Sequence, residues 1–448
     1  MDVKGANVSG DKSGFKPYLG LTFLIGFGFF TMGLMDILYD SYVPIFLGKY
    51  ISRNSLVGAV MTLDNILAIV LIPFVSLWSD NTRTRIGRRM PFIVVLLPLS
   101  AVCFALIPYA GGRSLAALLI VIFGLNLFKQ SARGPVVALM PDTVPGAFRS
   151  EANGIINTMG ALGSIISTVG LARLMSLDVN LPLLGNTKNR IPFPVAGLFV
   201  VLATILVFAF VRERSRDEED REEKVPLIKS LRSIAGEKDK SALWILLSLF
   251  CWFLGYQGIL PFIGKLSVEV FKQSMSNATL PAAMVGVAQA LFAIPSGFVA
   301  HRIGRRKAIR GALVVIVVLF SACAFLVSSL AGSLGLGTRF AIFLAVLFVL
   351  GAFWITIITN SFPMLWQMAT FGTIGIYTGL YYTFSQGAAI SSPPVTGAII
   401  DAFGYPGIFF FAAACMLLAY FLMGKVRSGE PSEQAAGEKA PSGPGAGA

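Results

Sequence analysis

Long apolar segments alternate with short polar ones along almost the whole chain. A helix that crosses a bilayer needs about 20 consecutive, mainly apolar residues. The pattern predicts twelve such spans, at residues 18–46, 55–79, 91–111, 114–140, 151–175, 192–211, 241–263, 280–300, 308–330, 338–366, 372–400 and 404–424. The predicted fold class is therefore an all-α membrane protein built from twelve transmembrane helices.

Two polar tracts divide this pattern. Residues 212–240 carry densely mixed acidic and basic side chains, which is typical of a solvated linker, and residues 425–448 are rich in Gly, Ser, Pro and Ala, which is typical of a disordered tail. The predicted organisation is a tail at 1–17, a six-helix bundle at 18–211, the linker at 212–240, a second six-helix bundle at 241–424 and the tail at 425–448.

The composition agrees with a membrane location. Hydrophobic residues make up 55% of the chain and charged residues 13%, whereas soluble proteins carry about 25% charged residues. The formal charge of +13 then indicates basic loops held on the cytoplasmic side rather than a nucleic-acid partner. Loops on the side of the N-terminus hold roughly three times as many Lys and Arg as the loops opposite. We therefore expect both termini in the cytoplasm and a multi-pass protein of the plasma membrane, or of the inner membrane if the source is bacterial.

Cysteine and histidine usage disfavours several other classes of protein. The four cysteines all lie in apolar runs and the chain has one histidine, so we expect neither disulfides nor a metal site. No Ser/His or Cys/His arrangement suggests an enzyme. A membrane receptor is a remote alternative, because it would usually carry a folded soluble domain, and this chain has only a short linker and two tails.

One basic five-residue segment occurs twice. Arg-Ile-Gly-Arg-Arg stands at 85–89 and again at 302–306, half a chain length later and again between two apolar runs. This repeat indicates two homologous halves. Twelve spans, a central charged linker and a matched basic loop in each half resemble the major facilitator architecture, in which two pseudo-symmetric six-helix bundles hold the substrate between them. The second copy also resembles the signature of that superfamily, Gly-x-x-x-Asp-Arg-x-Gly-Arg-Arg, with His301 in the place of the acid.

The first copy and several other segments resemble one branch of that superfamily. The loop SDNTRTRIGRRMPF at 79–92 resembles that of the glycoside-pentoside-hexuronide sugar symporters and the related sucrose transporters. Further similarity to sucrose transporters or their bacterial relatives lies in GPVVALMPD at 134–142, RSEANG at 149–154, FCWF at 250–253 and YTGLYY at 377–382. The resemblance implies a secondary transporter that moves a sugar or glycoside by alternating access, as a proton-coupled symporter. We expect it to act as a monomer.

Two alternatives of the same fold stay open, an uncoupled facilitator and a drug or metabolite exporter. Against the exporter, the predicted fifth span (151–175) lacks, from Asn153 to Gly170, the Gly-Pro-x-x-Gly-Gly stretch typical of such proton antiporters.

Five charged residues on the first, second and fourth predicted spans form a candidate cluster. Asp36 and Asp40 are four residues apart on the first span, Asp64 is on the second, and Lys129 and Arg133 are four apart on the fourth. Such groups cost about 2.5–3.5 kcal/mol each at mid-helix, so they mark ion pairs, wet cavities or proton paths. One interpretation is a site for proton coupling and substrate. The other is a set of structural ion pairs that only fix helix packing.

The family comparison bears on which group titrates. Sucrose transporters carry an acid on the fourth helix where this chain has Asn126, and melibiose-type sodium symporters carry acids where it has Ala68 and Ile72. The titrating role is then expected at Asp36, Asp40 or Asp64, with the proton as the coupling ion rather than sodium, and with no cofactor.

A sugar site needs hydrogen-bonding amides beside aromatic plates. The candidates in the spans are Asn126, Gln130, Trp252, Tyr256, Gln257, Asn360, Tyr381 and Gln386. For the aromatic members, ordinary packing or an interfacial belt is the competing interpretation.

The basic loops suit a gate better than a substrate site. Glycine permits the tight turn in each loop, and an acid can hold the arginines or face a helix N-terminus. The gating candidates are Asp80, Arg85, Gly87, Arg88 and Arg89 in the first copy, and Arg302, Gly304, Arg305 and Arg306 in the second. Because His301 replaces the acid, we expect the charge relay to depend mainly on the first copy.

Overall fold

A computed structural model describes residues 16–144, 148–182, 185–213, 239–368 and 374–429. Most of the predicted linker and of both predicted tails lies outside these residues. The helices are α1 (Lys16–Leu47), α2 (Asn54–Met61), α3 (Leu63–Asn81), α4 (Met90–Ala110), α5 (Leu115–Thr143), α6 (Arg149–Ile165), α7 (Pro192–Phe210), α9 (Ser241–Gln257), α10 (Leu260–Glu269), α11 (Leu280–Ile303), α12 (Arg305–Val327), α13 (Leu336–Trp366), α14 (Ile374–Phe403) and α15 (Tyr405–Gly424).

Every predicted span is helical, with ends that differ by a few residues from those expected. Within the described part of the chain, eleven helical segments are long and apolar enough to cross a membrane. The remaining long helix, α14, contains many small and hydroxylated side chains and two adjacent prolines. The prediction of an all-α membrane protein is confirmed.

Three of the spans are interrupted helices. The second span bends between α2 and α3 at Thr62. The seventh bends between α9 and α10, where Pro261, in the first turn of α10, cannot donate a helical hydrogen bond. The fifth continues from α6 through a π-helical turn, Ile166–Gly170, into a 3-10 turn, Leu171–Ser176. A short antiparallel hairpin, β1 (Asn180–Leu181) and β2 (Gly185–Asn186), follows and was not expected from the sequence.

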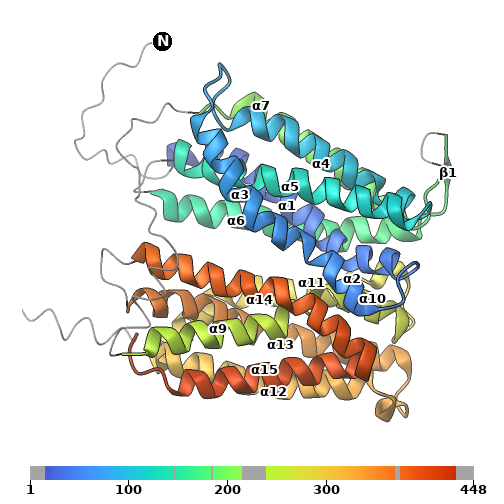
Figure 1. The fold of residues 1–448 in the computed structure, drawn as a ribbon, viewed down its shortest axis with the longest axis vertical. Coiled ribbons are helices and arrows are strands. Elements are labelled where there is room, and N and C mark those ends of the chain that lie inside the picture. The colour runs from blue at the N-terminus through green and yellow to red at the C-terminus, as the bar shows by residue number, and fades with distance from the viewer. Residues whose placement is uncertain (1–15, 145–147, 183–184, 214–238, 369–373, 430–448) are drawn as a thin grey trace, which may run out of the picture. The chain divides into compact units, whose positions relative to one another are not determined.

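The chain forms two compact units. Unit 1 comprises residues up to Tyr39, the segment from Ile66 to Asp220 and the short turn Met275–Asn277, while unit 2 comprises Asp40–Asn65 and the remainder. In unit 1, α4 packs against both α5 and α7 (Figure 1). In unit 2, α12 packs against α13 and α15, α9 packs against α14 and α15, and α2 packs on α14.

The assignment of residues 40–65 differs from the predicted halves, because this segment of the first half packs on helices of the second. The predicted boundary between the bundles, at 212–240, lies largely outside the described residues, and the division there stays a prediction.

Large apolar side chains face outward on several helices. Val70 and Phe74 on α3, Phe210 on α7 and Val318 on α12 are each about 60% exposed. In water such surfaces would be costly, whereas lipid tails are as apolar as the side chains themselves. The exposed faces therefore fit the surface that a bilayer would cover.

Candidate functional site

A buried lysine on α5 forms an ion pair with an aspartate on α1. The Lys129 Nζ lies 2.9 Å from Asp36 Oδ1, and the two side chains are 4% and 40% exposed. The same ammonium lies 5.2 Å from the centroid of the Tyr39 ring, where a cation–π contact adds to its stabilisation. The structure thus pairs two of the five predicted cluster residues, one of them shielded and the other accessible.

Two buried amides of α5 lie close to this ion pair. Asn126 and Gln130 are 0% and 1% exposed. Asn126 is three residues before Lys129 and four before Gln130, so its side chain borders both. The Asn126 Nδ2 donates a hydrogen bond of 2.9 Å to the Tyr39 hydroxyl. Asn126 Oδ1 and Gln130 Oε1 are buried acceptors that bond no described group. Because an unsatisfied buried acceptor costs about 1–3 kcal/mol, this site is suited to a ligand that brings hydroxyl donors.

The other three charges of the predicted cluster lie differently. Arg133, one helical turn further along α5, is exposed. Asp40 and Asp64 belong to unit 2 and are half-buried. Asp64 Oδ1 accepts a 2.6 Å hydrogen bond from the backbone N–H of Asn65, within the first turn of α3.

The aromatic candidates of unit 2 form a packed group. The rings of Tyr256 on α9 and Trp354 on α13 stack at a centroid distance of 3.9 Å and an angle of 13°. Gln289 of α11 donates a 3.2 Å hydrogen bond to the Tyr256 hydroxyl. Trp252 is fully buried, although its Nε1 bonds no described group. Trp354 and Gln289 were not among the sequence candidates, because neither stood out from other aromatic and amide residues of apolar helices.

The remaining candidates of unit 2 are mixed in character. Tyr381 on α14 is 6% exposed, and its hydroxyl lies 3.3 Å from Ser361 Oγ. Asn360 is buried, and its Nδ2 donates to the carbonyl of Thr356 one turn earlier in α13. Gln257 and Gln386 are half-buried. Of this group, the two glutamines are the most available to a solute.

The first basic loop is held by a carboxylate that the sequence analysis did not select. Asp142, near the end of α5, is 2% exposed and accepts from both Arg88, at 2.7 Å, and Arg89, at 3.0 Å. Arg89 is buried as well, and it also bonds Asp80, whose side chain is 45% exposed. Asp142 is therefore the buried anchor of this loop, and Asp80 is its partly solvated partner.

A second carboxylate binds the backbone of the same loop. Glu213 accepts hydrogen bonds from the N–H groups of Arg88, Arg89 and Met90, at 2.7, 2.8 and 2.7 Å. These N–H groups lie at the N-terminal end of α4, where the helix dipole favours an anion. Gly87 precedes them with a φ of +109°, which only glycine adopts without strain. We call this contact the Glu213 clasp.

The second copy of the loop makes the same turn as the first. Gly304 has a φ of +94°, and α12 begins at the next residue. Arg302 is exposed, as is Arg85 in the first copy, and Arg305 is half-buried. The half-buried Arg306 donates through Nη2 to the carbonyl oxygen of Gly424, at 2.5 Å.

At the opposite end of unit 2, which we call its outer end, an aspartate joins α14 to α2. Asp401 accepts from the backbone N–H of Asn54, at 2.7 Å, and of Ser55, at 3.0 Å. Lys265 of α10 donates to Asn54 Oδ1 at 2.6 Å. Because residues 54 and 55 precede the linker and Asp401 follows it, this contact ties sequence from the predicted first half to the second. Any opening at the outer end must break it.

The backbones of α2 and α14 also approach each other closely beside these hydrogen bonds. A Cβ atom added to Gly397 on α14 would lie 2.2 Å from the carbonyl oxygen of Asn54, and one added to Gly58 on α2 would lie 2.2 Å from that of Pro393. Glycine is required at both positions for α2 and α14 to meet as they do.

Gly397→Val is therefore expected to hold the outer end open. The added side chain clashes with backbone, and overpacking of this kind costs about 1–3 kcal/mol. Thr62, which is 3% exposed and donates to the Ile390 carbonyl, reports on the contact: a cysteine there should react several-fold faster with a membrane-impermeant maleimide. Gly379→Val is the matched control, because a Cβ at Gly379 on the same helix meets nothing within 4 Å. Equal labelling of the two variants would contradict the expectation.

Comparison with known sequences places these features in a family. The model of the Major Facilitator Superfamily matches residues 25–390 and 271–446. The chain is similar to the Sucrose transport protein SUC3 of Arabidopsis thaliana, at 25% identity over 206 residues, which cover 39% of this chain and 34% of that one. It is also similar to the Sucrose transport protein SUT4 of Oryza sativa subsp. indica, at 30% identity over 123 residues, covering 22% and 20%. The matched region thus spans about a third or less of these relatives.

Solved structures with the same fold are more distant in sequence. A variant of the nucleoside transporter NupG superposes with a TM-score of 0.70 at 12% identity, covering 91% of this chain and 99% of the other. A bacterial homolog of the human lysosomal transporter Spinster gives 0.70 at 13% identity, covering 93% and 97%. The E. coli fucose:proton symporter FucP gives 0.56 at 16% identity, covering 92% and 99%. At these identities the likeness shows the fold alone. Since the family model covers nearly the whole chain, the protein belongs to the Major Facilitator Superfamily and is a membrane transporter rather than an enzyme.

Proposed function

We propose that this transporter moves a sugar or sugar-like solute by alternating access, coupled to a proton that travels in the same direction. The observation that carries the proposal is the ion pair between Asp36 and Lys129, with the buried amides Asn126 and Gln130 beside it. Similarity to sucrose transport proteins supports the choice of solute. A sugar presents many hydroxyl donors, which match the two amide oxygens that bond no described group.

The charges of the pair suit coupling. The Asp36 carboxyl is 40% exposed and can exchange a proton with water. Lys129 is 4% exposed and stays close to its partner, because a buried charge without one is costly. Protonation of Asp36 releases the ammonium, which can then donate to a hydroxyl of the solute. Binding of the proton and binding of the solute would thereby favour each other.

Alternating access also requires a contact that forms in one state and breaks in the other. In this proposal that contact is the one between α2 and α14 at the outer end of unit 2. Its hydrogen bonds through Asp401 are exposed to solvent, so water can replace them when the contact opens. We further propose that the protein acts as a monomer in the plasma membrane, or the inner membrane of a bacterium, with both termini in the cytoplasm.

Uptake into proteoliposomes tests this function. Radiolabelled mono- and disaccharides, glycosides and nucleosides are offered with and without an inward proton gradient. Accumulation of one sugar or glycoside above its outside concentration, only with the gradient, is expected. Transport that merely equilibrates and ignores the gradient would identify an uncoupled facilitator. Failure of every sugar in the panel would refute the proposed substrate class.

A further inference from the structure

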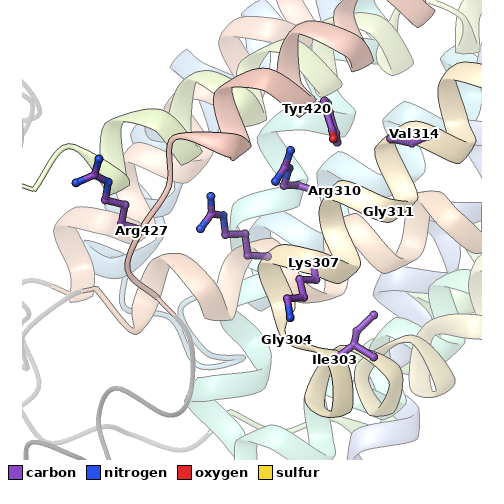
Figure 2. A pocket seen from close by; sticks show the side chains of 9 residues that line it. Ile303, Gly304, Lys307, Arg310, Gly311, Val314, Tyr420 and Arg427 are labelled. Atoms are coloured by element: carbon purple, nitrogen blue, oxygen red, sulfur yellow. The ribbon is translucent and has the colours of Figure 1, made fainter.

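A basic cavity lies at the end of unit 2 next to the second Arg-Ile-Gly-Arg-Arg loop. Its volume is about 800 Å³, and Arg306, Lys307, Arg310 and Arg427 line it together with Tyr420. Figure 2 shows Lys307 and Arg310 on α12, Tyr420 on α15 and Arg427 beyond the end of that helix, around one hollow. None of the described residues that line it is acidic. The cavity therefore gathers four positive charges.

Contacts within the cavity orient two of these side chains. The Arg310 guanidinium lies 4.4 Å from the centre of the Tyr420 ring, and its buried Nε bonds no described group. Arg306 donates to the Gly424 carbonyl. The Tyr420 ring that holds Arg310 carries no charge.

The equivalent turn in the first half of the protein binds a carboxylate. There the turn at Gly87 is followed by three N–H groups that the Glu213 carboxylate binds. The corresponding residues after Gly304 are Arg305, Arg306 and Lys307, the first turn of α12. The repeat therefore places the cavity where unit 1 has an anion.

The acidic residue that binds this turn in unit 1, Glu213, has a basic residue, Arg427, at the corresponding position of unit 2. Glu213 lies three residues after the end of α7 at Phe210, and Arg427 lies three residues after the end of α15 at Gly424. Arg427 does have an acidic neighbour, Asp239. Hydrogen bonds from Ser241 and then Ser428 lower the pKa of Asp239, and the charge of Arg427 adds to this effect. Asp239 is not one of the lining residues, so no described residue of the cavity corresponds to Glu213 of unit 1.

The surroundings of the cavity indicate where its anion comes from. Ile303 and Val314 also line it, and they are 49% and 46% exposed. Val318 on α12 and Phe421 on α15 continue the exposed apolar surface of the same two helices. A ligand with a negative head and an apolar body matches this combination, whereas a small soluble anion would use only the basic part.

We propose that the cavity binds the phosphate of an anionic membrane lipid, whose acyl chains lie along α12 and α15. The headgroup phosphate takes the place that the Glu213 carboxylate occupies in unit 1, facing the first turn of α12 and the side chains of Lys307, Arg310 and Arg427.

Native mass spectrometry of the full chain in detergent tests this site. The probes are phosphatidylglycerol, phosphatidylcholine and inorganic phosphate. The variant Lys307→Gln/Arg427→Gln removes two exposed cavity cations. The variant Arg83→Gln/Arg212→Gln is the control, because it removes two exposed cations that do not line the cavity. We expect phosphatidylglycerol to bind the native protein and the control in preference to phosphatidylcholine. The cavity variant should bind it roughly thirtyfold more weakly, as expected for two lost cations.

Three results would overturn the proposal. Equal retention of phosphatidylglycerol and phosphatidylcholine would show that the cavity does not prefer a lipid with a negatively charged headgroup. Equal weakening in the cavity variant and the control would show a general effect of net charge. Displacement of phosphatidylglycerol by equimolar inorganic phosphate would show a site for a soluble anion instead. Thermal unfolding of both variants in detergent checks that each is folded.

Discussion

Lys129→Ala is expected to reduce proton-driven uptake by about ten- to a hundredfold. The ammonium forms a 2.9 Å ion pair with Asp36, and a hydrogen bond between charged groups contributes about 1.5–3 kcal/mol, which corresponds to that range of rates. Since Asp36 is 40% exposed, water can solvate it after the substitution, so the fold should survive. The initial rate of uptake, with the folded fraction measured by size-exclusion chromatography, is the readout.

The chain offers a matched control for this experiment. Lys188 forms an ion pair of 3.0 Å with Asp178, and the two side chains are 59% and 50% exposed. An exposed pair contributes about 0–1 kcal/mol, so Lys188→Ala should leave uptake nearly unchanged. Asp36→Asn completes the set, because it removes the carboxyl that we propose carries the proton and should abolish the response to a proton gradient. Native rates in Lys129→Ala would assign the pair a purely structural role.

Asp142→Ala should destabilise the protein by about 3–5 kcal/mol, the usual cost of removing one member of a buried ion pair. Asp142 is 2% exposed and bonds two arginines, of which Arg89 is 5% exposed. The substitution would leave the buried Arg89 guanidinium with the partly exposed Asp80 as its carboxylate partner, beside neutral contacts to Ser76 and Ser79. Chemical unfolding in detergent micelles measures the change.

Two other alanine variants make that result specific. Asp80→Ala removes the 45% exposed partner of the same arginine, and we expect it to cost much less than Asp142→Ala. Asp178→Ala removes an exposed pair and should change stability by about 1 kcal/mol or less. A cost for Asp80→Ala as large as that for Asp142→Ala would make Asp80 the anchor of the loop.

Local patterns were sufficient to predict the helices of this protein. Apolar runs of 20 or more residues allow few structures in a bilayer, because every backbone N–H and C=O must be satisfied within the segment. The bends at Thr62 and Pro261 did not disturb that prediction, since both parts of each interrupted helix remain in one apolar run. The repeated loop likewise predicted two equivalent turns, and both Gly87 and Gly304 adopt a positive φ.

The partners of charged residues were harder to predict. Asp36 and Lys129 were selected together because a charge inside an apolar span is conspicuous. Asp142 and Asp401 were not, because each lies close to a helix end, where a carboxylate is unremarkable. Glu213 begins a tract of mixed charges and looked like part of a solvated linker. In each case the helix packing decides which donor the carboxylate meets, and that information is not local in the sequence.

The Glu213 clasp also determines where the chain can be cut to express its two halves separately. Glu213 is bound to the start of α4 although it lies beyond the last residue of α7. A first half expressed on its own would lose this carboxylate if the gene were cut directly after the sixth span, and three backbone N–H groups of α4 would be left to water. A cut placed further into the charged tract preserves it. Co-expression of two separate halves therefore calls for a break after residue 213, which makes the opening residues of the linker part of the first bundle.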